Sequence, residues 1–267
     1  MAGKLKHLAI SSENYAALAR FYQAAFGLTA SPTNRPEGAV SLSDGYLGMN
    51  FNIRRVGAWG RLDHYGFEID SIEELEDRLR DAYPRVQLLK RLSIRPFAGF
   101  TMHDPAGNYF DLSVPSMENR RDVYAEAGAE HPRYVHHLTL RAMEPELLCG
   151  FYRHVFDLEE RPKQAGDPNH YLFDGRITLV ITPWQIGDYT GGNVEAPGPD
   201  HIGFAVESLE KFEADVEHIK LRNPRLHPMQ LGYGPEGESR LRLFQSCHLG
   251  ERHIADPDGV LIDVVRA

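Results

Sequence analysis

The feature that most constrains this chain of 267 residues is an internal repeat with a constant spacing. A strand-like segment at 6–10 is followed by a helix-like apolar segment, and the same pattern returns in the second half of the chain. The matching residues are His7 and His137, Tyr22 and Tyr152, and Asp44 and Asp174, each pair 130 positions apart (137 − 7 = 130). One spacing kept across unlike motifs is hard to obtain by chance, so the chain consists of two related halves.

A second repeated unit follows each of these segments. It begins with a strand that contains an Asp-His pair, continues into a helix preceded by serine, and ends with an Asp-Pro-x-Gly turn and a final strand. The equivalent positions are His64 and His201, Ser71 and Ser208, and the turns 104–107 and 256–259. Serine is a favoured N-cap, and proline and glycine suit the dihedral angles of a tight turn. The sequence therefore predicts the same order of elements in every unit.

The repeat also predicts the fold class and the domain boundaries. We expect four units, each with a strand, a helix and then about three strands, which gives a mixed α+β protein rich in β-sheet. Residues 1–115 would hold the first two units and residues 133–267 the last two. Residues 116–132, which are charged and rich in alanine, are expected to form a partly helical linker. The stretch 222–240, with scattered Pro, Gly and Arg, predicts an irregular, mobile loop.

Composition excludes several classes of partner. The chain has 29 Lys and Arg against 38 Asp and Glu, and this net charge of −9 argues against nucleic-acid binding, which needs a basic surface. Its two cysteines are too few for a disulfide framework or a four-cysteine zinc site. Cys149 is expected to be a buried, inert thiol, and nothing marks Cys247 as a nucleophile. No apolar run suits a membrane span or a signal peptide, so we expect a cytoplasmic protein without membrane partners.

Alternation along the predicted strands separates a bulky face from a face with small and polar residues. The bulky face would pack against the helices, whereas the other face carries a histidine on the first strand of each unit and an aspartate on the last strand of each half. These residues are His7, His64 and Asp111 in the N-terminal half, and His137, His201 and Asp263 in the C-terminal half. Solvent exposure would explain polar side chains there, but not the same residue types in both halves.

Two imidazoles and one carboxylate on converging strands can form a facial triad for non-haem Fe(II), or a site for Mn, Co or Zn. The candidate ligands lie far apart in the sequence, so this prediction depends on the repeat to bring the strands together. The alternative is that these histidines are ordinary strand residues, hydrogen-bonded in the core. Because six equivalent positions share the pattern, we predict that at least one half binds a divalent metal.

These motifs resemble the vicinal oxygen chelate superfamily, which includes glyoxalases, bleomycin and fosfomycin resistance proteins, and extradiol dioxygenases. The resemblance rests on the Asp-His strand, the Phe-Tyr helix, the Asp-Gly turn and the Asp-Pro-x-Gly-x-x-x-Asp ending, and covers nearly all of both halves. It implies βαβββ modules in pairs, each pair forming a U-shaped mixed β-sheet domain. A tandem four-module chain of this kind is similar to the extradiol dioxygenases, which implies that His137, His201 and Asp263 hold iron between a catecholate and dioxygen.

The chain departs from that superfamily pattern at three points. Its last candidate ligand is Asp rather than Glu. The side chain is shorter by one methylene, but the ligating group is still a carboxylate. His253 stands where a dioxygenase tyrosine is expected, and His248 is the nearest candidate for a signature histidine, so both are candidate catalytic acid–base residues. The strands 47–53 and 177–182 lack the further acid of glyoxalases, although the amide of Asn50 is a substitute donor in the N-terminal half. A three-ligand set leaves room for dioxygen and favours dioxygenase over glyoxalase chemistry.

We therefore expect a metal-dependent enzyme that chelates a small substrate through two adjacent oxygens. The first hypothesis is extradiol-type, oxygen-dependent cleavage of an aromatic diol, with Fe(II) the favoured metal and Mn, Ni or Zn the alternatives. The second is a metal-dependent isomerase, epimerase or lyase of the glyoxalase type. The third is a protein that binds a small molecule without metal. A homo-oligomer formed through module edges is expected by analogy alone.

Overall fold

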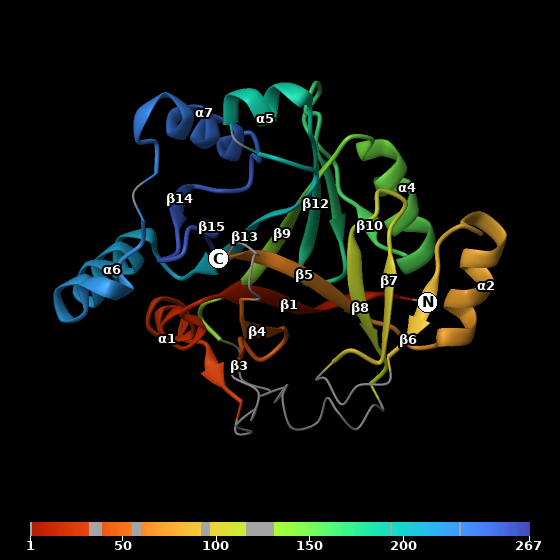
Figure 1. Cartoon of the computed structure of the whole chain (residues 1–267), viewed down its shortest axis with the longest axis horizontal. Helices are drawn as coiled ribbons and strands as arrows, with labels where there is room; N and C mark the ends of the chain where they lie inside the picture. The colour runs from red at the N-terminus through yellow and green to blue at the C-terminus, as the bar shows by residue number, and fades with distance from the viewer. Residues whose placement is uncertain are drawn as a thin grey trace.

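Each half of the chain forms one mixed β-sheet in the computed structural model, which describes residues 2–31, 39–54, 60–91, 97–115, 131–192, 194–229 and 231–267 (Figure 1). The N-terminal strands are β1 (Lys4–Ser12), β2 (Thr29–Ala30), β3 (Ala39–Ser43), β4 (Gly48–Ile53), β5 (Arg61–Glu68), β6 (Leu88–Lys90), β7 (Phe100–His103) and β8 (Tyr109–Ser113). Their order in the eight-stranded sheet is β2-β3-β4-β1-β5-β8-β7-β6. The helices α1 (Tyr15–Phe26) and α2 (Ile72–Ala82) follow β1 and β5, the first strand of each unit.

The C-terminal half repeats this arrangement with seven strands in the order β10-β11-β12-β9-β13-β15-β14. Its strands are β9 (Tyr134–Ala142), β10 (Glu159–Glu160), β11 (His170–Phe173), β12 (Thr178–Pro183), β13 (Gly198–Val206), β14 (Arg252–Ala255) and β15 (Leu261–Arg266). Its helices are α4 (Pro145–Phe156), α5 (Ile186–Gly192), α6 (Leu209–Arg222), the 3-10 helix η1 (Pro224–Leu226) and α7 (Gly234–Gln245). The first strands of the two units, β9 and β13, are neighbours, as are β1 and β5.

The helix boundaries follow from local sequence. Ser71 and Ser208 cap α2 and α6, as the sequence predicted, because each hydroxyl accepts a hydrogen bond from the backbone N–H three residues later. The helix α1 ends at Gly27 with a φ of 70°, and α4 ends at the equivalent Asp157 with a φ of 52°. Glycine adopts this left-handed conformation without steric cost, and aspartate is among the few other residues that tolerate it.

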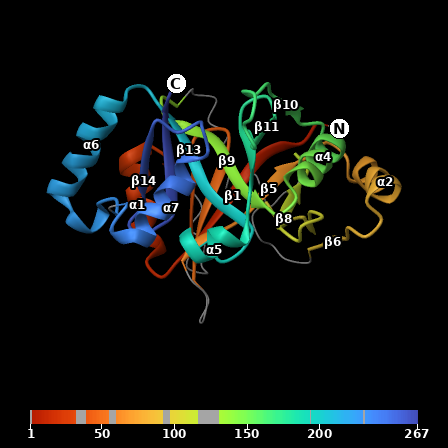
Figure 2. The same cartoon turned by 90° about the horizontal axis from the view of Figure 1, so that it is seen from above.

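Helices of one half pack against helices of the other. The helix α1 lies beside α6, and α2 lies beside α4 (Figures 1 and 2). Phe26 stacks on Phe204 with ring centroids 3.9 Å apart, and the equivalent Phe156 stacks on Phe67 with centroids 4.5 Å apart. One cluster of buried apolar residues therefore runs through both halves of the chain.

The repeated motifs also join the two halves through reciprocal hydrogen bonds. The hydroxyl of Tyr22 donates to Asp256 in the C-terminal half, and the hydroxyl of Tyr152 donates to Asp104 in the N-terminal half, both at 2.9 Å. A second reciprocal pair runs from the backbone N–H of Leu5 to Asp174 Oδ2 at 2.7 Å and from that of Val135 to Asp44 Oδ2 at 2.8 Å. The repeated tyrosines and aspartates of the sequence therefore also join the two halves.

We expect Asp256→Asn to stabilise the protein more at pH 8 than at pH 4. Burial raises the pKa of Asp256 from 3.8 to about 7, although backbone N–H groups and the Tyr22 hydroxyl oppose this rise. The stabilising contribution of the protonated carboxyl is complete below about pH 4 and is lost as the pH rises to about 7, because only the unfolded chain releases its proton readily in this window. An amide has no such proton to lose.

A shift of about three pKa units corresponds to at most about 4 kcal/mol of unfolding free energy. Thermal denaturation of wild type and Asp256→Asn at both pH values measures the difference. An equal change in Tm at pH 4 and pH 8 would contradict the raised pKa of Asp256.

The predicted α+β class with two paired mixed sheets is confirmed, but two details differ. In the described residues, the last unit has only an isolated bridge between Met229 and Ala255 where the N-terminal half has β6. The irregular loop predicted over 222–240 is wrong from Gly234 onward, where α7 begins: Pro235 lies in its first turn, where a missing N–H costs nothing, and Phe244 is buried.

The linker was predicted over 116–132. Residues 116–130 of it lie outside the described part of the chain. Within the described part, no helix is long and apolar enough to cross a membrane.

Candidate metal centre

One row of residues crosses four neighbouring strands of the C-terminal sheet. Gly203 on β13 is paired with His137 on β9 on one side and with Asp263 on β15 on the other, and Asp263 is paired with His253 on β14. His201 precedes Gly203 by two residues, so its side chain lies on the same face of the sheet. The sheet thus brings His137 within reach of Asp263, which is 126 residues away in the chain.

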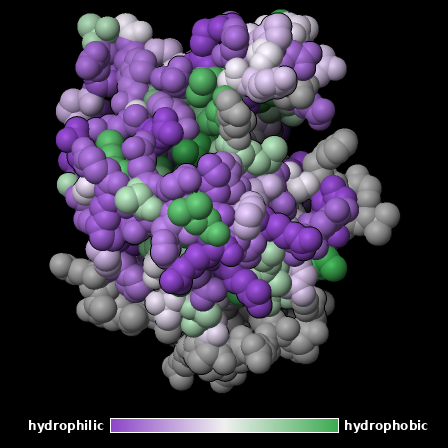
Figure 3. Space-filling model, turned by 90° about the vertical axis from the view of Figure 1, so that its left-hand side faces the viewer, coloured by the Kyte–Doolittle hydropathy of each residue, from purple (hydrophilic) through white to green (hydrophobic). Residues whose placement is uncertain are grey.

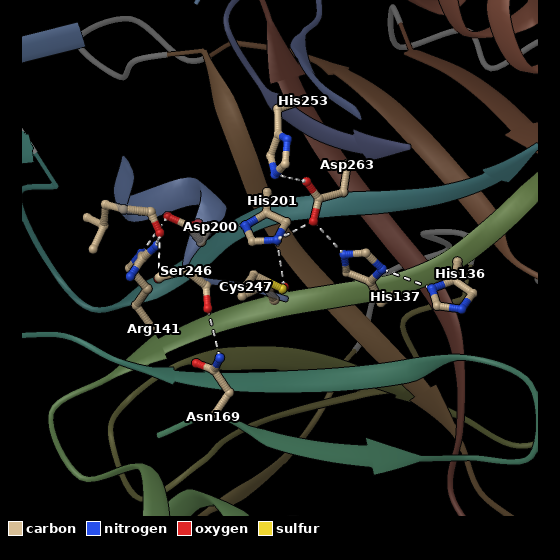
Figure 4. Close-up of polar contacts among 12 residues, drawn as sticks. His136, His137, Arg141, Asn169, Asp200, His201, Ser246, Cys247, His253 and Asp263 are labelled. Atoms are coloured by element: carbon tan, nitrogen blue, oxygen red, sulfur yellow. Dashed lines mark hydrogen bonds and ion pairs between the residues drawn. The ribbon is translucent and has the colours of Figure 1, made fainter. Parts of the chain in front are cut away.

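Asp263 lies at the centre of the resulting C-terminal cluster (Figure 4). Its Oδ2 is 3.1 Å from Nε2 of His137 and 3.3 Å from Nε2 of His201, and its Oδ1 is 3.3 Å from Nε2 of His253. Cys247, which follows α7, completes the cluster: His137, His201, Cys247 and Asp263 each offer one donor atom within 4.8 Å of the others. All four residues are buried.

The carboxylate of Asp263 is ionised despite its burial. Burial alone would raise its pKa, but the neighbouring His137 and His201 lower it to about 2. The negative charge is therefore retained at neutral pH, where it can attract a cation into the cluster.

A second layer of charged residues orients His201. Its Nδ1 is 2.7 Å from Oδ2 of Asp200, whose Oδ1 accepts a hydrogen bond from Arg141 at 2.9 Å (Figure 4). The same oxygen accepts a second hydrogen bond from Arg240 at 2.7 Å. Burial would raise the pKa of Asp200, but the two guanidinium groups and His201 hold it well below its usual range. With Nδ1 held by Asp200, Nε2 is the nitrogen of His201 that faces the cluster, where release of its proton would provide a lone pair for a metal, as in many metal-binding histidines.

The donor set of the C-terminal cluster fits a divalent cation. Among the described residues, Asp263 Oδ1 and His253 Nε2 are both buried and neither makes a hydrogen bond, although they lie 3.3 Å apart. A buried carboxylate oxygen without a donor is costly unless a cation or a proton neutralises it. His137, His201 and Asp263 can hold such a cation as a facial set, with Cys247 as a fourth donor.

The N-terminal half forms an equivalent cluster. The corresponding row across its sheet is His7, Gly66, Asp111 and Thr101. His64 Nε2 is 3.2 Å from Nε2 of His7 and 3.4 Å from Oδ2 of Asp111, and its Nδ1 is 2.8 Å from Asp63. Burial would lower the pKa of His64, but Asp111 and Asp63 raise it to about 9.

The two clusters differ in how their aspartates are satisfied. Thr101 donates a hydrogen bond of 2.6 Å to Oδ1 of Asp111, whereas the equivalent oxygen of Asp263 faces His253 without one. Phe97 stacks on His7 with centroids 5.0 Å apart, and both cysteines of the chain belong to the C-terminal half. Of the two clusters, the C-terminal one therefore has the unsatisfied carboxylate oxygen and the additional thiol donor.

The two candidate acid–base histidines lie in different surroundings. His253 stands beside Asp263, whereas the side chain of His248 is 55% exposed and lies 3.5 Å from Asp167. The amide oxygen of Asn50 accepts a hydrogen bond of 2.6 Å from Ser41.

Sequence reasoning missed Cys247 and the role of Asp200. The Asp-His pair that recurs in both halves was a signal for Asp200, since Asp63 and Asp200 contact His64 and His201 in the same way. Cys247 has no counterpart in the repeat and gave no signal.

Two cavities adjoin the clusters. One of about 700 Å³ is lined by Asp63 and Tyr109 from the N-terminal half and by Asp200 and Arg240 from the C-terminal half. The other, of about 690 Å³, is lined by His253 and by residues of α6 and α7.

Figure 3 views the molecule from the side of α6, where the surface is mostly hydrophilic and hydrophobic residues occur in small separate groups. The second cavity is therefore lined by elements on a side whose visible surface is mainly polar.

Comparison with known proteins places the fold. Residues 7–113 match the family model of the glyoxalase-like domain. The chain is similar to the Mn(II)-bound glyoxalase from Novosphingobium aromaticivorans, with 14% identity, a TM-score of 0.63 and coverage of 98% of this chain and 81% of that one. No curated protein sequence matches it significantly.

Two dioxygenase structures are similar to this chain to the same degree as the glyoxalase. The 2,3-dioxygenase LapB from a Pseudomonas species shows 15% identity and a TM-score of 0.63, with coverage of 100% of this chain and 93% of that one. The 2,2',3-trihydroxybiphenyl 1,2-dioxygenase from Sphingomonas wittichii shows 14% identity and a TM-score of 0.63, with coverage of 100% and 91%. Residues 7–113 thus match the glyoxalase-like domain, and the whole chain has the fold of these glyoxalase and dioxygenase structures. The fold that the resemblance in the sequence implied is confirmed.

Proposed function

We propose that this chain is a metal-dependent enzyme that binds a small substrate through two adjacent oxygens in the C-terminal half. His137, His201 and Asp263 would hold the cation. The observation that carries this proposal is the convergence of their donor atoms on a buried site in which Asp263 Oδ1 lacks a hydrogen bond. The first-choice reaction is oxygen-dependent cleavage of an aromatic diol, with Fe(II) as the metal, and the similar dioxygenase folds support this choice.

The residues around the cluster have distinct tasks in this proposal. Asp200, held by Arg141 and Arg240, keeps the ring of His201 in place and fixes its tautomer. Burial lowers the pKa of His253, so its ring is neutral at pH 7 and can accept a proton from a substrate hydroxyl. A bound iron would supply Lewis acidity and a path for electrons between the diol and dioxygen.

The test combines metal analysis with oxygen uptake. Protein purified without chelator and then loaded anaerobically with Fe(II) would be measured by inductively coupled plasma mass spectrometry. It would next be mixed with catechol and substituted catechols while dissolved oxygen is recorded. Stoichiometric iron together with diol-dependent oxygen uptake supports the proposal. Iron without uptake for any diol argues against the dioxygenase reaction, and absence of metal in every sample argues for a metal-free binding protein.

Cys247 favours a second candidate, a metal-dependent isomerase or lyase. Its thiol lies within 4.8 Å of the other donors and could occupy a fourth position on the cation, leaving less room for dioxygen. A similar fold occurs in a Mn(II)-bound glyoxalase. Turnover that proceeds equally well without oxygen, and with Mn, Ni or Zn, would support this candidate over the dioxygenase.

His253→Gln is expected to lower kcat by about 10²–10⁴-fold while the bound metal is retained. His253 faces Oδ1 of Asp263 with its Nε2 (Figure 4), and in this proposal it transfers a proton and is not a metal ligand. His248→Gln is the control, because that side chain points to Asp167, and we expect its kcat to be unchanged. Steady-state kinetics and metal content of both variants measure this. Equal losses in the two variants would exclude a specific role for His253.

A further inference from the structure

A third group of potential ligands lies away from the two repeated clusters. Cys149 on α4, Glu160 on β10 and His170 on β11 each offer one donor atom, and these atoms lie within 4.8 Å of one another. The group sits where α4 covers the edge of the C-terminal sheet (Figures 1 and 2). We call it the edge cluster.

The edge cluster is tightly connected and only partly open to solvent. Nδ1 of His170 is 2.9 Å from Oε1 of Glu160, and its Nε2 is 3.2 Å from Oε1 of Glu146. The thiol of Cys149 is hydrogen-bonded to Glu160, whose other oxygen accepts a bond of 2.9 Å from Arg153. Cys149 and His170 are buried, the Glu160 side chain is 28% exposed and that of Glu146 is 88% exposed.

The repeat shows that the fold does not require these polar residues. Positions 130 residues earlier occupy the same places in α1, β2 and β3, and they hold Ala19 for Cys149, Ala30 for Glu160 and Val40 for His170. Ala16 and Gln23 stand in place of Glu146 and Arg153. The N-terminal half therefore builds the same helix and sheet edge with small, apolar or neutral side chains. A buried histidine and thiol placed against two glutamates need a reason other than folding.

We propose that the edge cluster is a second cation site, separate from the centre at Asp263, and that it binds Zn²⁺. Thiolate, imidazole and carboxylate are the ligand types that zinc takes in proteins. Cys149, Glu160 and His170 supply three ligands, and the exposed Glu146, already beside His170, can turn in as the fourth. On binding, the Cys149 thiol releases its proton to solvent and forms the S–Zn bond.

The charge of the edge cluster suits this ligand. With the cation bound, the Cys149 thiolate and the two glutamates would carry three negative charges against the single positive charge of Arg153, which contacts Glu160. A divalent cation would bring the group close to neutrality. Arg153 competes with the cation for Glu160, so its removal is expected to tighten binding.

The test measures zinc in a protein whose proposed catalytic centre has been disabled, so that failure of the proposed function leaves the result intact. His137→Ala is stripped with chelator, dialysed against Zn²⁺ and analysed for metal, and the same is done after adding Cys149→Ala and His170→Val. These two changes install the residues of the N-terminal half, so the fold is expected to persist, as circular dichroism would verify. We expect the first protein to hold one equivalent of zinc that the second lacks.

Cobalt(II) provides a second readout, because a thiolate ligand gives an intense charge-transfer absorption in the near ultraviolet. That band is expected in His137→Ala and in His137→Ala with Cys247→Ser, and it should disappear with Cys149→Ala. Arg153→Gln, again the N-terminal residue, is expected to tighten zinc binding by about threefold to tenfold, as removal of one weak competing ion pair should. Two outcomes would show that the edge cluster is an ion-pair network and not a zinc site. They are equal zinc content with and without Cys149 and His170, and a cobalt band that persists in Cys149→Ala.

Discussion

Asp263→Asn is expected to remove the metal from the centre at Asp263 and to abolish turnover. The substitution keeps the shape of the side chain but replaces an anionic oxygen by a neutral amide at the point where His137 and His201 converge. Loss of a direct ligand should weaken binding by more than the ~10–100-fold that follows loss of an outer partner. Metal content by mass spectrometry and steady-state turnover measure the two effects.

Asp111→Asn is the matched control, because Asp111 holds the same place in the N-terminal row. Its Oδ1 is already satisfied by Thr101, so we expect the variant to keep its metal and its turnover. Metal retained in Asp263→Asn but lost in Asp111→Asn would contradict our assignment and move the centre to His7, His64 and Asp111. Partial loss in both variants would instead indicate one cation in each half.

Gly203→Ala is expected to destabilise the protein and to displace a proposed ligand at the same time. A Cβ at this position would lie 2.0 Å from ring atoms of His137, so the imidazole must move. Overpacking of this kind typically costs about 1–3 kcal/mol of unfolding free energy. Because Gly203 separates His137 from Asp263 in the row, we also expect the metal affinity to fall by at least ~10-fold, like the loss of an outer partner.

Variants at two other glycines distinguish the effect on stability from the effect on metal affinity. At Gly66 in the N-terminal half a Cβ would meet the ring of Phe97 at 2.6 Å, so Gly66→Ala should lower stability without loss of metal from the C-terminal half. Gly150 lies inside α4, and a Cβ there would have no described side chain within 4 Å, so Gly150→Ala should stabilise the helix by about 0.5–1 kcal/mol. Calorimetry and metal titration on the three variants give the result. Unaltered metal affinity in Gly203→Ala would show that His137 is not a ligand.

Much of the fold was predictable because the repeat appears directly in the residue order. The period of 130 residues indicated two related halves, and strand alternation separated the helix-facing side from the side of the histidines. The paired strands then placed His7 and His137 in equivalent rows, each opposite a glycine. Local rules were sufficient for this step, since side chains alternate along a strand and serine caps a helix wherever these elements form.

The details of the candidate centre were not predictable in the same way. Cys247 enters the C-terminal cluster because it follows α7, whose Phe244 packs on the ring of His201. The sequence pattern of 222–240 indicated a loop there. Arg141 and Arg240 come from elements far apart in the sequence, and folding brings both of them to Asp200. His248 and His253 were equivalent candidates in the sequence, yet only His253 lies on a strand paired with that of Asp263.

By itself, the sequence determined that the chain has two halves of one α+β design and that each half carries two histidines and one aspartate on one face of a sheet. Those properties depend on neighbours in the chain and on a period that repeats. Only the tertiary structure decided how the two halves differ: which aspartate lacks a hydrogen bond, and which thiols join a cluster. The reason is physical, because the charge and hydrogen bonding of a buried group depend on residues that the sheets bring together from more than a hundred positions away.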